Sequence, residues 1–434
     1  MLRVMRRFLL ILAALLTLPA AAFAQPDAIE RENAAYSRAG QIVRVMQGEL
    51  PAEAVFAPSF LAAVPAQQLE ALTAQLVDQY GRVVASDDAS YKGNGAASFD
   101  VLFEKARGAA SLQLAADAPY QVTGFRISSM TPQDDTPEKI LDDLAALPGT
   151  AGIGVYRLAE DRPQPVLGWK ADMPMAVGST FKLYVLSALA REIREGRRNW
   201  DDIVPLQRRS VPSGQMQDWP ENAPVTLQTL ATMMISISDN TATDTLMRLL
   251  GREALAAEVI ASGHSVPERT LPLLTTVELF ALKSGDPARI AAYSAADRAG
   301  RAALLEQWAP SLVRERVDGA KLAGSEPVAI DSIEWFASAG DIARLFQRLR
   351  DLDDPTVLKI LAANPALPQE EREYWSYTGY KGGSEAGVLN LSWLLADASG
   401  DWYVVSASWN DPAKPLDNTR LELLAMRILG MLHQ

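Results

Sequence analysis

The segment Gly178-Ser179-Thr180-Phe181-Lys182-Leu183 decides how the larger part of this 434-residue chain is interpreted. It opens a stretch whose apolar residues recur at the spacing of one helix face, namely Leu183, Leu186, Leu189 and Ile193. Ser179 is therefore predicted at or near a helix N-terminus, where free backbone N–H groups and the helix dipole stabilise a developing negative charge. Lys182 follows one turn later on the same face. Buried there, its ammonium would lose proton affinity, so that the neutral amine accepts the proton of Ser179.

The composition leaves few other ways to build a covalent catalyst. The chain has no cysteine, and its only histidines are His264 and His433. A thiol enzyme is excluded, a Cys/His zinc site has too few ligands, and a Ser-His-Asp enzyme would have to use one of those two imidazoles. A serine activated by a lysine is the most economical arrangement left. We expect neither a metal nor a cofactor.

A second polar cluster, Ser238-Asp239-Asn240, follows an apolar run and precedes a predicted helix. The hydroxyl of Ser238 can relay a proton to a leaving nitrogen or oxygen. The amide of Asn240 can bind a substrate carbonyl while it contacts Lys182. Asp239 is expected to fix the loop through hydrogen bonds to the backbone. Alone, this tripeptide is an ordinary turn or helix cap.

A third cluster, Lys381-Gly382-Gly383-Ser384, ends an aromatic run that is predicted to be a strand. Gly382 and Gly383 at the strand end let a ligand lie close to the backbone, as an added strand would. The N–H of Ser384 would face that of Ser179 as a second oxyanion donor. Lys381 would attract a substrate carboxylate, to which the hydroxyl of Ser384 donates a hydrogen bond. Alone, a glycine bulge beside a surface lysine explains this cluster equally well.

Together the three clusters resemble the serine β-lactamase and penicillin-binding-protein superfamily, and class A β-lactamases in particular, whose signature is S-x-x-K, S-D-N and K-T-G. The resemblance covers residues 138–434. It implies an α+β fold, in which helices flank an antiparallel sheet beside an all-helical subdomain. It implies that Ser179, Lys182 and Ser238 are catalytic. The substrate-binding residues that it implies are Asn240, Lys381, Gly383 and Ser384.

The chain departs from the family pattern at two places. Gly382 stands where the family usually carries Thr or Ser. The E-x-x-L-N loop, whose Glu in class A enzymes holds the water that hydrolyses the acyl-enzyme, is missing from residues 266–278. Glu278 is interpreted as half of a capping box with Thr275, and Glu268 is the other acid of that stretch. We therefore expect acylation without a dedicated base for deacylation.

Two domains are predicted beyond the N-terminal segment, joined by a polar, proline-punctuated linker over residues 131–137. Residues 25–130 are predicted to form a small α+β domain that resembles cystatin-like or steroid-isomerase-like curved-sheet modules. We expect it to serve packing or substrate gating. Its predicted elements are a helix with Leu69, Leu72, Leu76 and Tyr80 on one face, capped by Gly81, and strands over 98–103, 111–114 and 120–127.

The second domain, over residues 138–434, is predicted to form one antiparallel sheet from strands near both of its ends, with helices packed on it. Those strands are expected over 152–158, 165–169, 377–382, 389–396 and 402–409. The whole layout is similar to the two-domain β-lactamase-like serine hydrolases, among them the esterase-like type found with clavulanic acid biosynthesis.

The first 24 residues are predicted to be a secretory signal. Arg3, Arg6 and Arg7 form a basic region, an apolar stretch follows, and Ala22-Phe23-Ala24 is an A-x-A-type cleavage site. The Arg6-Arg7 pair also permits twin-arginine export. The apolar stretch is too short for a membrane span, and no cysteine follows it to carry a lipid anchor. We expect a periplasmic or secreted protein without a membrane anchor.

The charge of the chain bears on its partners. It is −12 overall, with scattered basic residues, which argues against nucleic acid and anionic lipid. We expect a small acyl compound, a β-lactam or an ester, as substrate. The predicted activity is that of a class A-like serine hydrolase. The alternatives are an esterase, a peptidoglycan D,D-carboxypeptidase, or a module that binds or senses β-lactams without turnover. The oligomeric state is left open.

Overall fold

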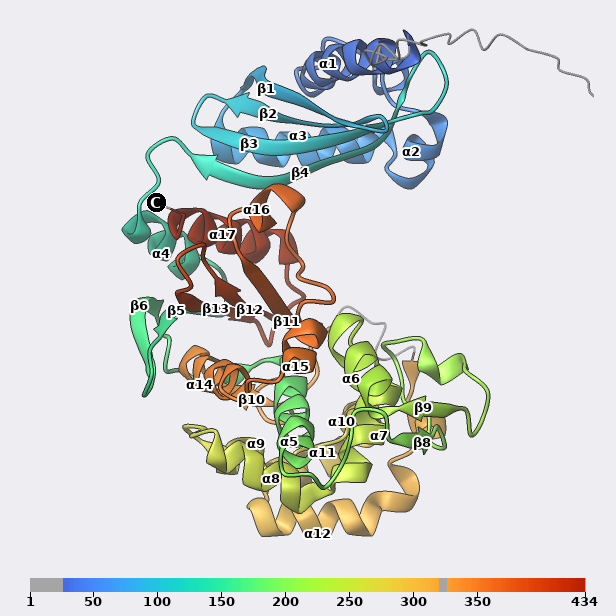
Figure 1. The fold of residues 1–434 in the computed structure, drawn as a ribbon, viewed down its shortest axis with the longest axis vertical. Coiled ribbons are helices and arrows are strands. Elements are labelled where there is room, and N and C mark those ends of the chain that lie inside the picture. The colour runs from blue at the N-terminus through green and yellow to red at the C-terminus, as the bar shows by residue number, and fades with distance from the viewer. Residues whose placement is uncertain (1–25, 320–325, 434) are drawn as a thin grey trace, which may run out of the picture. The chain divides into compact units, whose positions relative to one another are not determined.

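The structure, a computed structural model, describes residues 26–319 and 326–433 of the chain (Figure 1). The predicted signal sequence, residues 1–24, lies outside the described residues. Contacts divide the chain into two compact units, Met1–Ser128 and Ser129–Gln434. None of the described helices has an apolar stretch long enough to cross a membrane.

The N-terminal unit combines helices with one four-stranded sheet. The helices are α1 (Pro26–Met46), η1 (Ala52–Ala54), α2 (Pro58–Ala63) and α3 (Ala66–Tyr80). The strands, in sheet order, are β1 (Val83–Gly93), β2 (Ala96–Phe103), β3 (Ala106–Leu114) and β4 (Val122–Pro132). Helix α1 packs against the first three of these strands. The resemblance of this unit to cystatin-like or steroid-isomerase-like modules stays a prediction.

Three details of this unit differ from the sequence analysis. Helix α3 ends as predicted at Gly81, which has φ +79, but Leu72 is 47% exposed and the buried positions are Leu69, Thr73 and Tyr80. Strand β1 was not predicted, because most of its residues are polar, only one of them is buried, and it lies at the sheet edge. Strand β4 continues through Pro132, into the stretch expected to be a linker.

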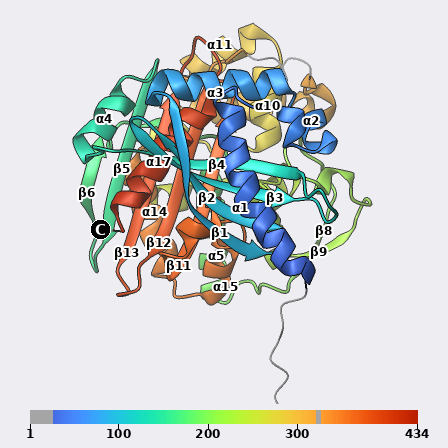
Figure 2. The same cartoon turned by 90° about the horizontal axis from the view of Figure 1, so that it is seen from above.

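The second unit is built on a five-stranded antiparallel sheet of order β11-β12-β13-β5-β6 (Figure 2). Its strands are β5 (Thr150–Leu158), β6 (Pro163–Trp169), β11 (Tyr377–Glu385), β12 (Val388–Ala396) and β13 (Trp402–Asn410). These match the predicted strands to within a few residues, and the α+β prediction is confirmed. The register pairs Lys381 with Ser392, and Ser392 with Ser406.

Helices cover both faces of this sheet. On one face, α4 (Pro137–Ala145) and α17 (Asn418–Met431) pack on alternate strand residues such as Val405 and Ala407. On the other, α14 (Ala339–Arg350) packs on the intervening residues, such as Val404, and α5 (Lys182–Arg194) packs against α14. The nine residues of β12 are all buried, as expected for a strand covered on both faces.

The remaining elements form a helical region beside α5. Its helices are α6 (Leu227–Ser236), α7 (Asn240–Leu250), α8 (Arg252–Ala261), α9 (Pro267–Thr270), α10 (Thr276–Lys283), α11 (Pro287–Ala295), α12 (Arg298–Trp308) and α15 (Pro355–Leu361). Its 3-10 helices are η2 (Gly178–Phe181), η3 (Met216–Asp218), η4 (Ala309–Ser311) and η5 (Arg314–Arg316). Short strand pairs join β7 (Met175–Ala176) to β10 (Phe336–Ala337) and β8 (Ile203–Pro205) to β9 (Pro224–Thr226). Helix α16 (Gln369–Arg372) lies instead beside α17, where Glu371 pairs with His433 at 2.8 Å (Figure 1).

Helix α5 lies at the centre of this unit. The sequence predicted a helix with one apolar face, but all of its residues from Lys182 to Ala190 are buried. A helix that is surrounded on all sides has a fixed position and direction. The side chains at its N-terminus are therefore held in place by the core of the domain.

Candidate active site

Ser179 lies in a tight turn between β7 and α5. Gly178 before it has φ +49, a left-handed conformation that a residue with a Cβ rarely adopts. The ring of Phe181 stacks on that of Trp335, with centroids 3.8 Å apart. The N–H of Val177 donates to the carbonyl of Trp335 at 3.0 Å. These contacts anchor the turn on both sides and leave Ser179 partly exposed between them.

Lys182 is completely buried at the start of α5, and oxygen atoms of the second cluster hold its ammonium. Nζ donates to Oδ1 of Asn240 at 2.7 Å, to the carbonyl of Ser238 at 2.7 Å and to its Oγ at 3.0 Å. All of these partners are uncharged. The structure thus brings Lys182, Ser238 and Asn240 together one turn after Ser179. Ser179 Oγ itself makes no hydrogen bond to another side chain of the described residues.

Two buried ammonium groups meet at Ser238. Nζ of Lys381 donates to Oγ of Ser238 at 3.1 Å and also to the carbonyl of Gly382. Burial, followed by the neighbouring charge of Lys381, lowers the pKa of Lys182 well below its ordinary value. Burial lowers the pKa of Lys381 to about 7. A pair of unneutralised amines around one hydroxyl favours loss of a proton, as a general base requires.

The second cluster is held in place by the carboxylate of Asp239. Ser238 has φ +59, which is uncommon for a residue other than glycine. Asp239 caps α7 by accepting from the N–H of Ala242 at 2.9 Å. Its other oxygen accepts from the N–H groups of Gln215 and Met216 at 2.7 and 2.8 Å. The predicted role of Asp239 in fixing this loop is confirmed.

The third cluster lies against the turn that carries the nucleophile candidate. A Cβ on Gly383 would lie 2.1 Å from the carbonyl oxygen of Val177 and 2.4 Å from the backbone nitrogen of Ser179. Only glycine permits this approach. Ser384 follows at an exposed position, and its backbone nitrogen would lie 3.1 Å from a Cβ on Gly178. Lys381, Gly383 and Ser384 are therefore all next to the Gly178–Lys182 segment.

Gly382, which stands where the family usually carries Thr or Ser, packs against the end of the Tyr380 side chain. A Cβ on Gly382 would lie 2.1 Å from Oη of Tyr380 and 2.8 Å from its Cζ. The ring of Tyr380 packs against Trp393, with centroids 5.1 Å apart. The end of the Tyr380 side chain therefore fills the space that a larger residue at position 382 would need.

A buried polar network beneath this turn was missed by the sequence analysis. Oγ1 of Thr180 donates to Oδ1 of Asn390 at 2.7 Å, and Oγ of Ser392 donates to the same oxygen at 2.8 Å. Nδ2 of Asn390 donates to Oγ of Ser408 at 2.9 Å. Polar residues at every second position of an otherwise apolar strand, as in Asn390 and Ser392, are the signal that could have shown it.

The two acidic residues within residues 266–278, Glu268 and Glu278, both form contacts that stabilise the local structure. Glu278 forms the predicted capping box with Thr275, and it also pairs with Arg252. Glu268 is 67% exposed at its side chain and pairs with Arg298 at 3.2 Å. Both carboxylates are thus paired with arginines, and among the described residues neither is hydrogen-bonded to a candidate catalytic side chain.

The segment between these two acids contributes leucines to the core. Leu271, Leu273 and Leu274 are each at most 3% exposed. Where class A enzymes carry a Glu that holds the hydrolytic water, this segment thus buries apolar side chains. The lack of a dedicated base for deacylation stays a prediction.

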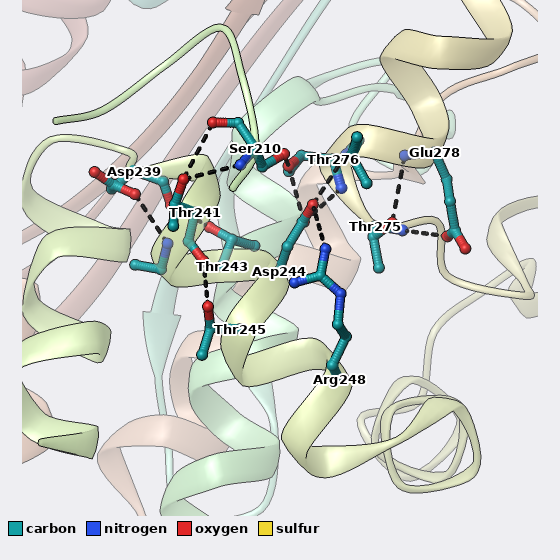
Figure 3. A network of polar contacts seen from close by, with 12 residues as sticks. Ser210, Asp239, Thr241, Thr243, Asp244, Thr245, Arg248, Thr275, Thr276 and Glu278 are labelled. Atoms are coloured by element: carbon teal, nitrogen blue, oxygen red, sulfur yellow. Dashed lines mark hydrogen bonds and ion pairs between the residues drawn. The ribbon is translucent and has the colours of Figure 1, made fainter. Parts of the chain in front are cut away.

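One more carboxylate, Asp244, acts on the charge of Lys182 but is bound by Thr276, Val277 and Arg248. Figure 3 shows Asp244 with Thr276 and Arg248. Asp244 accepts from the N–H and Oγ1 of Thr276 at 2.7 and 2.8 Å and from the N–H of Val277 at 3.0 Å. Burial raises its pKa. Asp244 therefore ties α7 to α10. No cluster of three or more His, Asp or Glu with metal-binding geometry occurs within residues 26–319 and 326–433.

The family model described as the beta-lactamase enzyme family matches residues 136–364, more than half of the chain. Curated proteins give no match. Similar solved structures include a β-lactamase from Sphaerobacter thermophilus, with 19% identity and a TM-score of 0.46, which covers 68% of this chain and 95% of that chain. A putative class A β-lactamase from Rhodopseudomonas palustris has 16% identity and a TM-score of 0.48, with 68% and 98% covered.

A third similar structure is the L158E mutant of PBP-A, an acyl-enzyme complex with penicillin G. It has 16% identity and a TM-score of 0.47, with 68% of this chain and 95% of that chain covered. The sheet with helices on both faces is the β-lactamase-like fold. With this fold and a family match over more than half of its length, the chain belongs to the beta-lactamase enzyme family.

Proposed function

We propose that this protein is an exported serine hydrolase that forms an acyl-enzyme on Ser179 with a β-lactam or a related acyl compound. The observation that carries the proposal is the burial of Lys182 among uncharged oxygen atoms, with Lys381 bound to the same Ser238 hydroxyl. Burial without a carboxylate partner favours the neutral amine that a general base needs.

In the proposed acylation step, Lys182 and Ser238 carry the proton of Ser179 to the leaving group. Neutral Lys182 takes the proton of Ser179 Oγ as that oxygen bonds to the acyl carbon. The N–H groups of Ser179 and Ser384 stabilise the resulting oxyanion. The carbon–nitrogen bond then breaks, Ser238 gives its hydroxyl proton to the leaving nitrogen, and Lys182 returns a proton to Ser238 along their 3.0 Å hydrogen bond.

Substrate binding is assigned to the remaining residues of the site. The side-chain amide of Asn240 binds a carbonyl group of the substrate. Lys381 and the hydroxyl of Ser384 bind a carboxylate of the substrate. β11 is an edge strand of the sheet, so the substrate backbone can lie along it as an added strand, while Gly383 lets the Ser179 turn lie close to that edge. Lys381 is cationic only below its pKa of about 7, so this contact depends on pH.

A second candidate function is an acyl-binding module that turns over slowly or not at all. It is favoured by one observation, namely that Glu268 and Glu278 are both paired with arginines and that the leucines between them are buried. Without a base for the hydrolytic water, the acyl-enzyme with a β-lactam would persist. A more labile acyl group, such as that of an ester, would still be released.

Intact-mass spectrometry of the purified protein after incubation with penicillin G tests the acyl-enzyme. The expected result is an added mass of one penicillin in the wild type and none in Ser179→Ala. Parallel assays with nitrocefin, a p-nitrophenyl ester and a D-Ala-D-Ala peptide separate the hydrolase, the esterase and the carboxypeptidase. A persistent adduct with no turnover of any of them supports the binding module. If no acylating probe modifies either protein, the covalent mechanism is wrong.

The proposal of export rests on the sequence of residues 1–24 alone. We expect the N-terminus of the protein recovered from a bacterial periplasm to begin at Gln25. Recovery of the uncut chain from the cytoplasm would contradict export and would leave the acylation chemistry untouched.

A further inference from the structure

A cavity of about 980 Å³ lies within the helical region of the second unit, and none of the candidate catalytic residues lines it. Its walls come from the C-terminal half of α7, the start of α8, the N-terminus of α10 and the turns that contain η3, η4 and η5. This volume falls at the upper end of the range that small-molecule sites occupy, ~300–1,000 Å³.

The walls of this cavity are basic, although the chain as a whole is acidic. The charged residues that line it are Arg208, Arg209, Arg248, Arg252, Arg314, Glu221, Glu278 and Glu315. Five arginines therefore face three glutamates, in a chain whose net charge is −12. Such a local excess of cations in a concave site concentrates anions.

Two of the five arginines already donate their hydrogen bonds to acceptors within the protein. Arg209 donates to the carbonyls of Met216, Gln217 and Trp219. Arg252 pairs with Glu278 and donates to the carbonyl of Leu273 at 3.2 Å. These two side chains build the wall rather than offer donors to a ligand.

The other three arginines have most of their N–H donors without an acceptor in the described part of the protein. Arg208 forms no hydrogen bond or ion pair with any described residue. Arg314 makes a single 3.4 Å contact, to the carbonyl of Gln217. Arg248 has its carboxylate partner, an oxygen of Asp244, at 3.7 Å, beyond hydrogen-bond distance (Figure 3). Three guanidinium groups with five N–H donors each thus face the cavity with few acceptors.

The carboxylates of the cavity wall do not supply the missing acceptors. Glu278 is occupied by Arg252 and by the N–H of Thr275. Glu221 and Glu315 are exposed, and within the described part of the chain neither lies within 4.0 Å of a basic side chain. Burial lowers the pKa of Arg248, and the nearby Arg208 lowers it further against the opposing effect of Asp244.

We propose that this cavity binds a small anion that carries two or more carboxylate or phosphate groups, held by Arg208, Arg248 and Arg314. The planar fork of a guanidinium matches the two oxygens of a carboxylate or phosphate. Three such forks around one cavity suit a polyanion better than a single charge. The proposal is independent of acylation at Ser179, because the two sets of residues do not overlap.

Isothermal titration calorimetry of the purified protein at low ionic strength, with citrate and with pyrophosphate, tests the proposal. Saturable binding of one molecule of either anion is expected, and the tighter of the two identifies carboxylate or phosphate as the preferred group. The double variant Arg208→Ala/Arg314→Ala should weaken that binding by about tenfold or more, since each lost charge-assisted hydrogen bond costs about one power of ten. Raising the salt concentration should weaken it as well.

Arg316→Ala is the matched control, because Arg316 lies on η5 with Arg314 but does not line the cavity. It should leave the dissociation constant unchanged. Arg208 and Arg314 make almost no contacts, so the double variant should unfold at the same denaturant concentration as the wild type. The proposal is wrong if neither anion binds saturably, or if Arg316→Ala weakens binding as much as the double variant does.

Discussion

Lys182 and Lys283 are both buried lysines of the second unit, but their partners differ in charge. Nζ of Lys182 is bound by a hydroxyl, a backbone carbonyl and an amide oxygen. Nζ of Lys283 is bound by the carboxylates of Glu334, at 2.6 Å, and Glu385. Burial opposes the charge on Lys283, yet the two carboxylates outweigh it and raise its pKa, whereas burial and Lys381 lower the pKa of Lys182.

The difference shows that burial alone does not identify a reactive lysine. An ammonium with a carboxylate partner stays protonated and contributes to structure, and one without such a partner becomes a base. Glu385 follows the third cluster directly in sequence, so the end of β11 contacts both sites, with Lys381 bound to Ser238 and Glu385 paired with Lys283. The predictions below test this distinction.

The largest effect is expected for Lys182→Met. The second-order rate constant of acylation by penicillin G should fall about 10²–10⁴-fold, the usual contribution of a general base. The free energy of unfolding should fall by no more than about 1 kcal/mol, because the substitution removes a buried amine that has no carboxylate partner. Stopped-flow acylation and urea unfolding measure the two quantities. Unchanged acylation would remove Lys182 from the mechanism.

The opposite result is expected for Lys283→Met, in which the two buried carboxylates lose their cation. The free energy of unfolding should fall by about 3–5 kcal/mol, as for other broken buried ion pairs. The folded fraction should still be acylated at Ser179, with a rate constant within a few-fold of the wild type. The idea of a purely structural Lys283 fails if unfolding is unaffected while acylation is lost.

A smaller effect should follow from pH, because the pKa of Lys381 is lowered to about 7. Lys381 is cationic below this pH and becomes neutral above it, so its attraction for a substrate carboxylate is lost as the pH rises. The ratio of acylation by penicillin G to acylation by a p-nitrophenyl ester without a carboxylate should therefore fall about tenfold per pH unit above 7. A ratio that stays constant between pH 6 and 9 would exclude Lys381 as the carboxylate contact.

The smallest effect is expected for Glu278→Ala. Loss of the capping box should lower the free energy of unfolding by about 1 kcal/mol, while the rate of deacylation stays unchanged. Mass spectrometry that follows decay of the adduct measures the second quantity. A tenfold slower decay in this variant would show that Glu278 serves as the hydrolytic base after all.

Much of the second unit follows from local sequence patterns. The five strands of its sheet, the helix that begins near Ser179 and the predicted capping box at Thr275 are present in the structure. Each depends on residues close together in the chain, so periodicity and cap chemistry suffice to predict it. The proximity of the three clusters was inferred from the resemblance to a family.

The contacts that hold the site together join residues far apart in sequence, and no local pattern predicts them. Phe181 and Trp335 form such a pair, as do Thr180 and Asn390. The ion pair between Lys283 and Glu334 is a third contact of this kind. In the N-terminal unit, Leu72 was expected in the core because of its apolar side chain, but α3 presents Thr73 there. Which face of a helix is covered depends on its neighbours in space.

The glycine at position 382 restricts the mutational routes by which this protein can acquire the residue that its family usually has there. Gly382→Thr introduces a side chain into the space that the hydroxyl of Tyr380 now fills, so it needs a compensating change at Tyr380. A smaller residue at 380 alone would instead leave a void against Trp393. Either substitution alone, at position 382 or at position 380, is therefore expected to destabilise the protein. A variant that gains the extra substrate contact would need both substitutions together.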